Sequence, residues 1–126
     1  MTKHRWLSAC IVMAAVLLLV SQISPSSGKP AARMGDKTAH GGSIVRGCPS
    51  VLIGGKPAAR IGDPHTCPMM IYAPQPIPHV GGPILTGSKT VLIGGKPAAR
   101  LGDQALCRNS PPDTISQGCA SVLIGD

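Results

Sequence analysis

One phrase occurs almost unchanged twice in this chain, and it restricts the fold more than any other feature. It reads Val-Leu-Ile-Gly-Gly-Lys-Pro-Ala-Ala-Arg-Ile-Gly-Asp over residues 51–63 and recurs over 91–103 with one Ile replaced by Leu. A third copy begins mid-phrase at 28–36, and the chain ends by starting a fourth at 122–126. Repeated units of this kind bury their apolar faces against one another. The last copy supplies the Val-Leu-Ile run that the first copy lacks, so the sequence predicts a pseudo-three-fold ring closed by the C-terminal strand.

Each unit is predicted to be a hairpin of very short strands, which makes the domain all-β. Val-Leu-Ile is the first strand, the glycines and Lys-Pro form the turn, and Ala-Ala-Arg with the next apolar residue is the second strand. A Gly-Gly-x-Ile-x-x-Gly segment follows at 41–47 and 81–87, with a degenerate equivalent at 112–118. The stretch 68–78 contains four prolines, so we expect a loop or an edge there and not a central strand.

The composition does not suit a conventional core. The chain of 126 residues contains no Phe, and Trp6 and Tyr72 are its only aromatic residues. Aromatic side chains carry much of the buried area of ordinary domains, and small domains bury proportionally less surface. Chains of this kind are commonly stapled by disulfides or by a metal.

Metal-ligating residues recur at equivalent places in the repeat. Four residues after each Gly-Asp stand His40, Cys67 and Cys107, and His79 precedes its Gly-Gly segment much as His40 does. Equivalent positions of a three-fold ring can point together at the axis. Imidazole and thiolate are the ligands of closed structural zinc sites, so we expect one Zn²⁺ that stabilises the fold. The fourth ligand is open: His65 and Cys67 are two residues apart and face the same way on an extended segment, and the repeat register favours Cys67.

Other polar residues of the repeat are expected to have structural roles. Cys48 and Cys119 stand where the second unit has Ser88, so we expect small buried residues there and not ligands. Two disulfides among the four cysteines of the body are the alternative, but they would use two of the expected ligands. Arg60 and Arg100 flank turns and are expected to be exposed, each contributing less than about 1 kcal/mol.

The N-terminus differs from the rest of the chain. Lys3, His4 and Arg5 precede an apolar stretch over residues 6–20, and a polar linker follows to residue 27. A basic patch, a short apolar run and small residues are the parts of a secretory signal peptide, and a membrane anchor is the alternative. We therefore divide the chain into a signal-like or anchor segment, 1–27, and a repeat domain, 28–126.

The repeated tetrapeptide Pro-Ala-Ala-Arg, at 30–33, 57–60 and 97–100, resembles the signature of the PAAR-repeat proteins. The resemblance covers residues 28–126 and implies a sharp cone of short strands with a zinc ion near its apex. It also implies three histidines and one cysteine as the zinc ligands, which here would be His40, His65, His79 and Cys107.

The resemblance further implies a structural role. Proteins of this family sit on the blunt end of the VgrG trimer, the spike of the bacterial type VI secretion system, and many carry effector proteins. We expect one copy per trimer, a tip that contacts the target membrane, and secretion through the type VI apparatus. The alternative is an exported or membrane-tethered zinc-binding β-module that is not attached to a spike.

Two other classes of function fit poorly. The formal net charge is +7, but its Lys and Arg residues are spread over the repeats and lack interleaved aromatic residues, so nucleic acid is not an expected partner. A zinc hydrolase needs an open metal position and a carboxylate base. The chain contains no Glu, and three of its five aspartates belong to the repeated Gly-Asp, so we expect neither an enzyme nor a small-molecule substrate.

Overall fold

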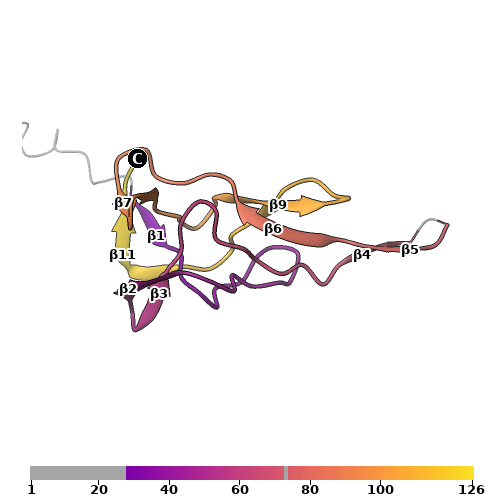
Figure 1. Ribbon diagram of the computed structural model, residues 1–126, viewed down its shortest axis with the longest axis horizontal. Helices are drawn as coiled ribbons and strands as arrows, with labels where there is room; N and C mark the ends of the chain where they lie inside the picture. Colours follow the sequence, from indigo (N-terminus) through magenta and orange to yellow (C-terminus); the bar gives the residue numbers. More distant parts are fainter. Residues whose placement is uncertain (1–27, 73) are drawn as a thin grey trace, which may run out of the picture.

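The body of the protein tapers from a broad end, formed by three short hairpins, to a single projecting hairpin (Figure 1). The structure, a computed structural model, describes residues 28–72 and 74–126, and these residues form strands but no helix. The strands are β1 (Lys29–Ala31), β2 (Cys48–Ile53), β3 (Lys56–Ala58), β4 (Met70–Tyr72), β5 (Pro76–Pro78), β6 (Val80–Ile84), β7 (Leu92–Ile93), β8 (Lys96–Pro97), β9 (Gln104–Arg108), β10 (Asp113–Thr114) and β11 (Cys119–Ile124). The all-β, cone-shaped body that we expected is confirmed.

The repeated phrase forms the same two-residue hairpin in two units. In β2–β3 the turn is Gly54-Gly55, with φ of 57° and 80°, and the turn of β7–β8 has nearly the same angles. Positive φ at both central residues is a conformation that favours glycine and matches the twist of paired strands. The second strand of each hairpin begins earlier than predicted, on Lys-Pro, and includes the following Ala only in β3. The arginines form isolated bridges to alanines of neighbouring units instead of continuing the hairpin.

The chain closes the ring by pairing its last strand with its first. In β1–β11, Lys29 pairs with Ile124 and Pro30 with Leu123, the same register in which Lys56 pairs with Ile53 within β2–β3. The terminal Val-Leu-Ile run thus stands in for the strand that the first unit lacks. The predicted closure is confirmed.

Three alanines hold the units together at the axis. The N–H of Ala32 donates to the carbonyl of Ala99 at 3.0 Å, that of Ala99 to Ala59 at 3.0 Å, and that of Ala59 to Ala32 at 2.9 Å. All three side chains are at most 1% exposed. A closed circuit of backbone hydrogen bonds needs backbones in close approach, which explains why the tetrapeptide has alanine here.

Two thin apolar layers replace a conventional core. The layer at the broad end contains a buried Ala and Ile from each unit, and Cys48 packs with them: Ala31, Ala58, Ala98, Ile53, Ile93, Ile124 and Cys48. The second layer lies beyond the alanine circuit and contains Ala32, Ala59, Ala99, Ala105, Ile44, Ile84 and Ile115. Small and β-branched residues suffice because each layer is shared by all three units.

The arginine of each tetrapeptide folds back onto the aspartate three residues later. In the third unit, Arg100 Nε lies 3.2 Å from Asp103 Oδ2, and the Arg100 backbone N–H donates to the same oxygen at 2.7 Å. The Arg100 side chain is 6% exposed, and that of Arg60, paired with Asp63, is 15% exposed. The expectation of exposed arginines was wrong, because the Gly-Asp turn places a buried carboxylate under each guanidinium.

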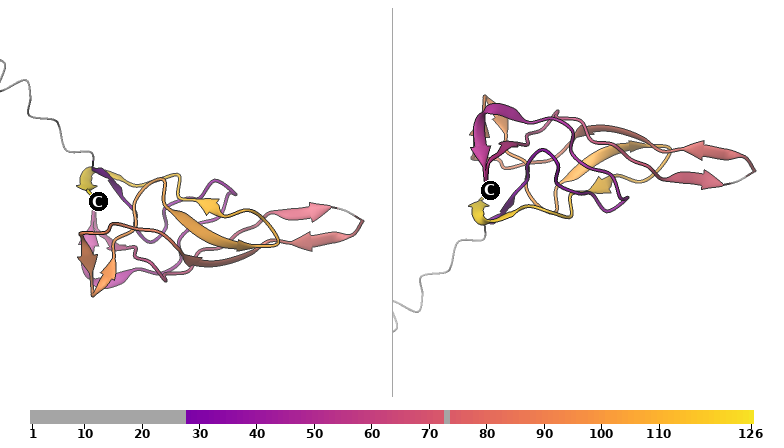
Figure 2. Two further views of the ribbon diagram at one scale, coloured as in Figure 1. Left: turned by 90° about the horizontal axis from the view of Figure 1, so that it is seen from above. Right: turned by 90° about the horizontal axis from the view of Figure 1, so that it is seen from below.

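The narrow end is built from the part of the chain that differs most between units. Strands β10, β9 and β6 form one sheet, and β4 and β5 continue beyond it as a two-stranded hairpin (Figure 2). The proline-rich stretch is thus an edge element, as expected. Among the described residues, no helix has the length and apolar character needed to cross a membrane. The segment 1–27 lies outside the described residues, so its prediction as a signal or anchor, and the domain boundary after it, stay predictions.

Candidate metal centre

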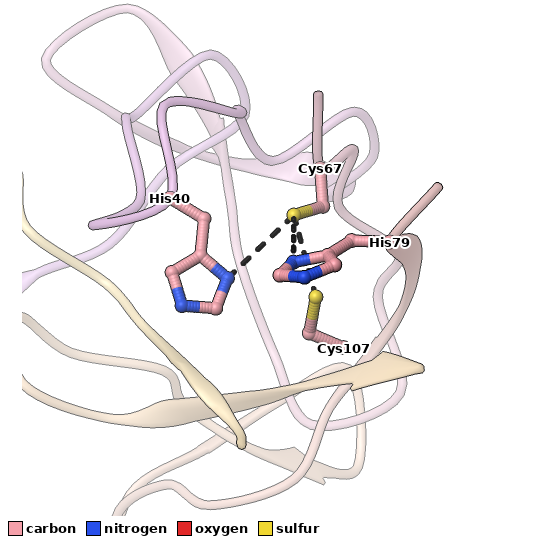
Figure 3. Close-up of side chains that lie close together, drawn as sticks. All are labelled: His40, Cys67, His79 and Cys107. Atoms are coloured by element: carbon pink, nitrogen blue, oxygen red, sulfur yellow. Dashed lines mark hydrogen bonds between the residues drawn. The ribbon is translucent and has the colours of Figure 1, made fainter. Parts of the chain in front are cut away.

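Two histidines and two cysteines converge near the root of the β4–β5 hairpin, and their side chains point toward one another (Figure 3). His40 and Cys67 lie on loops of the first and second units, His79 links β5 to β6, and Cys107 lies in β9. One ligand atom from each of the four side chains lies within 4.8 Å of every other. Cys107 is buried and the other three are half-buried. The structure therefore assembles a four-ligand set from distant parts of the chain.

The distances within the cluster match a tetrahedral zinc site. Cys67 Sγ lies 3.6 Å from His40 Nδ1 and 3.7 Å from His79 Nδ1. A tetrahedral Zn²⁺ with ordinary bond lengths holds nitrogen and sulfur about 3.6 Å apart and two sulfurs about 3.8 Å apart. The sulfur atoms of Cys67 and Cys107 are 3.3 Å apart, somewhat closer than that but well beyond a disulfide bond of about 2.05 Å. Two imidazoles and two thiols in this arrangement suit a closed structural site with no open position.

His65 is not part of the cluster, so the set with three histidines is not the one that the structure assembles. Its ring lies deeper in the body, where Nδ1 is 2.8 Å from the carbonyl oxygen of Gly82. His65 and Cys67 do lie on one extended stretch, but two residues along a strand separate side chains by roughly 6–7 Å. Only Cys67, the alternative favoured by the repeat register, reaches the level of His40, His79 and Cys107.

Comparison with protein-family models gives a direct assignment. The model described as PAAR motif matches residues 34–77 and again 74–126, which together cover most of the chain. The chain belongs to the PAAR-motif family. No curated protein matches it significantly.

The two matches to the PAAR motif divide the candidate metal centre between them. His40 and Cys67 fall only within the first match, and Cys107 only within the second. A complete four-ligand set thus requires both matched segments. The four residues therefore meet only where segments from the two matches come together.

Close backbone contacts position the Cys67 segment relative to the other units. A Cβ atom on Gly42 would lie 1.7 Å from the carbonyl oxygen of Thr66, and one on Gly81 would lie 2.0 Å from that of His65. Neither glycine tolerates a side chain in this arrangement. The two glycines allow residues 64–66 to run between the segments that carry Gly42 and Gly81, and this path brings the Cys67 thiol to the cluster.

Asp113 is a residue of this region that sequence reasoning missed. In the third PAAR unit it stands where the first two have Gly42 and Gly82, and it is fully buried. Its Oδ1 accepts hydrogen bonds from the backbone N–H of His40 at 3.0 Å and of Thr114 at 2.8 Å. The signal was the departure from glycine in the degenerate third copy.

The environment of Asp113 favours its charged form. Burial raises the pKa of its carboxyl, but the adjacent Thr38 hydroxyl, the His40 N–H and the His40 ring together outweigh burial and hold the pKa below its ordinary value. Its second oxygen, Oδ2, lies 3.2 Å from His65 Nε2 and 3.8 Å from His40 Nδ1. Asp113 therefore connects the loop of one cluster residue, His40, with the buried ring of His65.

The Cys107 thiol is the most buried of the four cluster side chains. Burial raises its pKa, and the neighbouring Cys67 thiol raises it further. A metal bound here would have to displace the proton, because thiolate and not thiol is the ligand. The other two cysteines of the described chain are remote: Cys48 and Cys119 bond the hydroxyls of Ser50 and Ser121 at the broad end. Cys48 is buried as expected and Cys119 is half-buried, and all four cysteines are free.

Proposed function

We propose that this protein is the structural tip of a type VI secretion spike. Its broad end seats on a VgrG-type trimer with one copy per trimer, and its narrow end points toward the target membrane. Membership of the PAAR-motif family, which consists of structural spike-tip proteins, supports this role. We further propose that His40, Cys67, His79 and Cys107 hold one Zn²⁺ that fixes the narrow half of the body. The complex leaves the cell through the secretion apparatus.

The observation that carries the proposal is a triad of exposed leucines at the broad end. Leu52, Leu92 and Leu123 occupy equivalent positions in the three units and are 61%, 61% and 54% exposed. Each lies directly opposite a proline of its own hairpin, so the three are displayed in the same way. Equivalent large apolar side chains left in water on one face indicate an interaction surface.

The symmetry of this face selects the kind of partner. A surface with three equivalent leucines around an axis matches a partner that offers three equivalent pockets around the same axis, as a homotrimer does. Exposed lysines at equivalent positions, Lys29, Lys56 and Lys96, stand beside the leucines and favour a rim with acidic groups. The axis of a trimer can be occupied once, and one copy per trimer follows.

The position of the cysteine and histidine cluster supports a mechanical role. A tip that transmits force has to be rigid. A metal cross-link between the two PAAR matches would restrain the loops that the thin apolar layers leave uncovered. Structural zinc contributes folding free energy on the order of 10 kcal/mol. The ion would supply a cross-link here and no reaction.

The test is binding of the purified protein to the cognate VgrG-type trimer, followed by pull-down and native mass measurement. Wild type should bind with one copy per trimer. The substitutions Leu52→Glu, Leu92→Glu and Leu123→Glu should each weaken binding about ten-fold or more. Each replaces a leucine that the trimer would bury with a charged side chain. Leu85→Glu is the matched control, since Leu85 is 45% exposed and directly follows β6 of the narrow-end sheet, outside the three broad-end hairpins.

Three copies per trimer, or leucine variants that bind as wild type does, would contradict the seated broad end. Absence of binding by the wild-type protein would favour the zinc-binding module that is not attached to a spike. Sequencing the N-terminus of the native protein separates the two further. A mature form that starts beyond residue 20, found in the envelope, would place the protein away from the site where a spike is loaded.

A further inference from the structure

The β4–β5 hairpin projects beyond the metal centre as a ribbon that the rest of the body does not cover (Figures 1 and 2). Its strands pair only with each other, with Ile71 opposite Ile77 and Tyr72 opposite Pro76. All six strand residues are exposed. A lone two-stranded ribbon is marginally stable in water, so its persistence here needs a cause outside its own pairing.

The root of the ribbon supplies that cause. Cys67 lies three residues before β4, and His79 follows β5 directly, so two of the four cluster residues flank the hairpin. The His79 N–H also donates to the carbonyl of Met69 at 2.8 Å. A metal held by the cluster would therefore clamp both strands at the point where they leave the body.

The chemistry of the hairpin is apolar on both faces. No charged residue occurs over 68–78, and its described side chains include exposed Met69, Met70, Ile71, Tyr72 and Ile77. In strands, successive side chains point to opposite faces, so these residues cannot all be covered by one contact on one side. A protein groove would cover one face, whereas a lipid phase surrounds the ribbon on every side.

The backbone of β5 also suits a medium without water. Unpaired N–H groups at a strand edge are costly in hydrocarbon. Pro76 and Pro78 have no N–H, so Ile77 is the only residue of β5 that carries a donor, and Ile77 lies opposite Ile71 in the ladder. The outer edge of β5 presents no donor to the surroundings.

The dimensions fit insertion into one leaflet. Three to four extended residues reach roughly 10–13 Å, which compares with the 5–10 Å depth of interfacial elements and is well short of the ~30 Å hydrocarbon core. Arg108 lies at the root, opposite Val80 in β6–β9, and is exposed. A cation at this level would meet phosphate groups while the ribbon lies deeper.

We propose that the β4–β5 hairpin is a lipid-inserting point, clamped at its root by the metal centre, that buries its apolar side chains in the acyl region of the first leaflet that the tip meets. The proposal rests on the proposed function for the direction in which the tip travels. It assigns the membrane contact to one element of this chain.

The test measures the depth of a single tryptophan in vesicles of phosphatidylcholine and phosphatidylglycerol with brominated acyl chains. The full chain is used, with Trp6→Phe to remove its one native tryptophan. Tyr72→Trp in this background should show a blue-shifted emission and strong quenching by bromine. Leu92→Trp is the matched control at the broad end and should show neither. The Leu92→Trp protein also carries residues 1–27, so it reports any membrane binding by that segment. Such binding would not bring the hairpin into the acyl region.

Charge on the ribbon should abolish the effect. Ile71→Glu and Ile77→Glu, each combined with Tyr72→Trp, should weaken partitioning about ten-fold or more. Leu85→Glu, directly after β6 and in the same background, should not. Absence of quenching in the Tyr72→Trp protein, equal quenching in the Tyr72→Trp and Leu92→Trp proteins, or quenching that survives both charged variants would each overturn the proposal. Circular dichroism verifies that the variants are folded.

The same variants separate this inference from the spike role. Hairpin variants should still bind the VgrG-type trimer. Leucine variants of the broad end, combined with Tyr72→Trp, should still show a quenched tryptophan in vesicles. Loss of quenching with intact trimer binding removes the lipid proposal alone. Intact quenching without trimer binding removes the spike proposal alone.

Discussion

The imidazole of His65 and the carboxylate of Asp113 face each other beneath the cluster of His40, Cys67, His79 and Cys107, with Nε2 and Oδ2 3.2 Å apart and both side chains buried. His65 Nδ1 lies 2.8 Å from the Gly82 carbonyl oxygen, which can only accept, so the Nδ1 proton points there. Both Nε2 of His65 and Oδ2 of Asp113 are buried, and neither forms a hydrogen bond with any other described group. Because Asp113 also accepts the His40 N–H, this pair supports the loop that carries one cluster residue.

We expect His65 to stabilise the fold without binding the metal. His65→Ala removes the contact of its ring with the Gly82 carbonyl and leaves the buried Asp113 Oδ2 without its nearest ring nitrogen, and should lower the free energy of unfolding by about 1–3 kcal/mol. Zinc content should stay at one per chain. Chemical denaturation and metal analysis of the purified variant measure both quantities.

Cys67→Ser is the contrasting variant, because it removes a cluster thiol and should lower zinc content sharply. If His65→Ala lost its zinc while Cys67→Ser kept it, the ligand set would be the one with three histidines. Asp113→Asn should destabilise in the same direction as His65→Ala, since an amide retains the shape of the carboxylate but not its charge.

Removal of the metal should lower the melting temperature strongly. The apolar layers are thin, and a structural zinc site contributes folding free energy on the order of 10 kcal/mol. Chelation, or replacement of His40, His79 or Cys107 by Ala, should therefore produce a large downward shift in thermal scans. Cys48→Ser and Cys119→Ser are the controls and should change little. An unmoved transition after chelation would mean that the layers alone hold the body together.

The arginines of the tetrapeptide should matter more than surface charges do. Arg100→Ala leaves the buried Asp103 carboxylate unpaired and also removes the ion pair of Arg100 with Asp126. We expect a loss of about 3 kcal/mol or more, from the cost of an uncompensated buried charge. Lys89→Ala is the control for an exposed cation. Equal urea midpoints for Arg100→Ala and Lys89→Ala would contradict the structural role of the pair.

Enlarging one residue of the alanine circuit should destabilise the whole ring. Ala59→Val forces two methyl groups into a position that is 0% exposed and lies beside the backbones of both other units. Overpacking of this kind costs typically about 1–3 kcal/mol. Ala120→Val, at an exposed position, is the control, and thermal unfolding compares the two. A variant at Ala59 as stable as wild type would show that the axis has spare volume.

Deletion of residues 122–126 should open the broad end. The first unit would lose the partner of β1, and the leucine triad would lose Leu123. We expect loss of trimer binding even though all four cluster residues remain. Native mass measurement with the trimer, together with metal analysis, tests this. Full binding by the truncated protein would mean that two units suffice for seating.

The closed ring was predictable from the sequence because the repeat copies at the two ends of the body are complementary. The Val-Leu-Ile run is missing from the first copy and present at the C-terminus, and pairing follows from that arrangement. The exposure of the arginines was misjudged because the sequence places them beside turns. It does not reveal that each arginine folds back onto a buried aspartate such as Asp103. Burial of that kind depends on the level at which neighbouring units stack.

The repeat-equivalent positions of the cluster residues were predictable from the sequence, but the height of each side chain along the axis was not. Equivalent positions identified His40, Cys67 and Cys107, whereas the resemblance favoured His65 over Cys67. Both residues face inward, and only the height along the axis separates them, which no spacing along the chain gives. Asp113 was beyond prediction for a related reason, since a departure from glycine marks a changed position without saying what the new side chain meets.

Within the hairpin formed by β1 and β11, Ile124 and Lys29 occupy the places that Ile53 and Lys56 occupy across the turn at Gly54 and Gly55. Gly125 and Gly28 stand next to them at the two open ends. Joining these glycines directly, with residues 1–27 and Asp126 omitted, would recreate the Ile-Gly-Gly-Lys turn of the other units. The chain could then be cut at the turn of β7–β8 instead and keep its strand pairs as a circular permutant. The fold specifies the neighbours of each unit, and not which unit comes first.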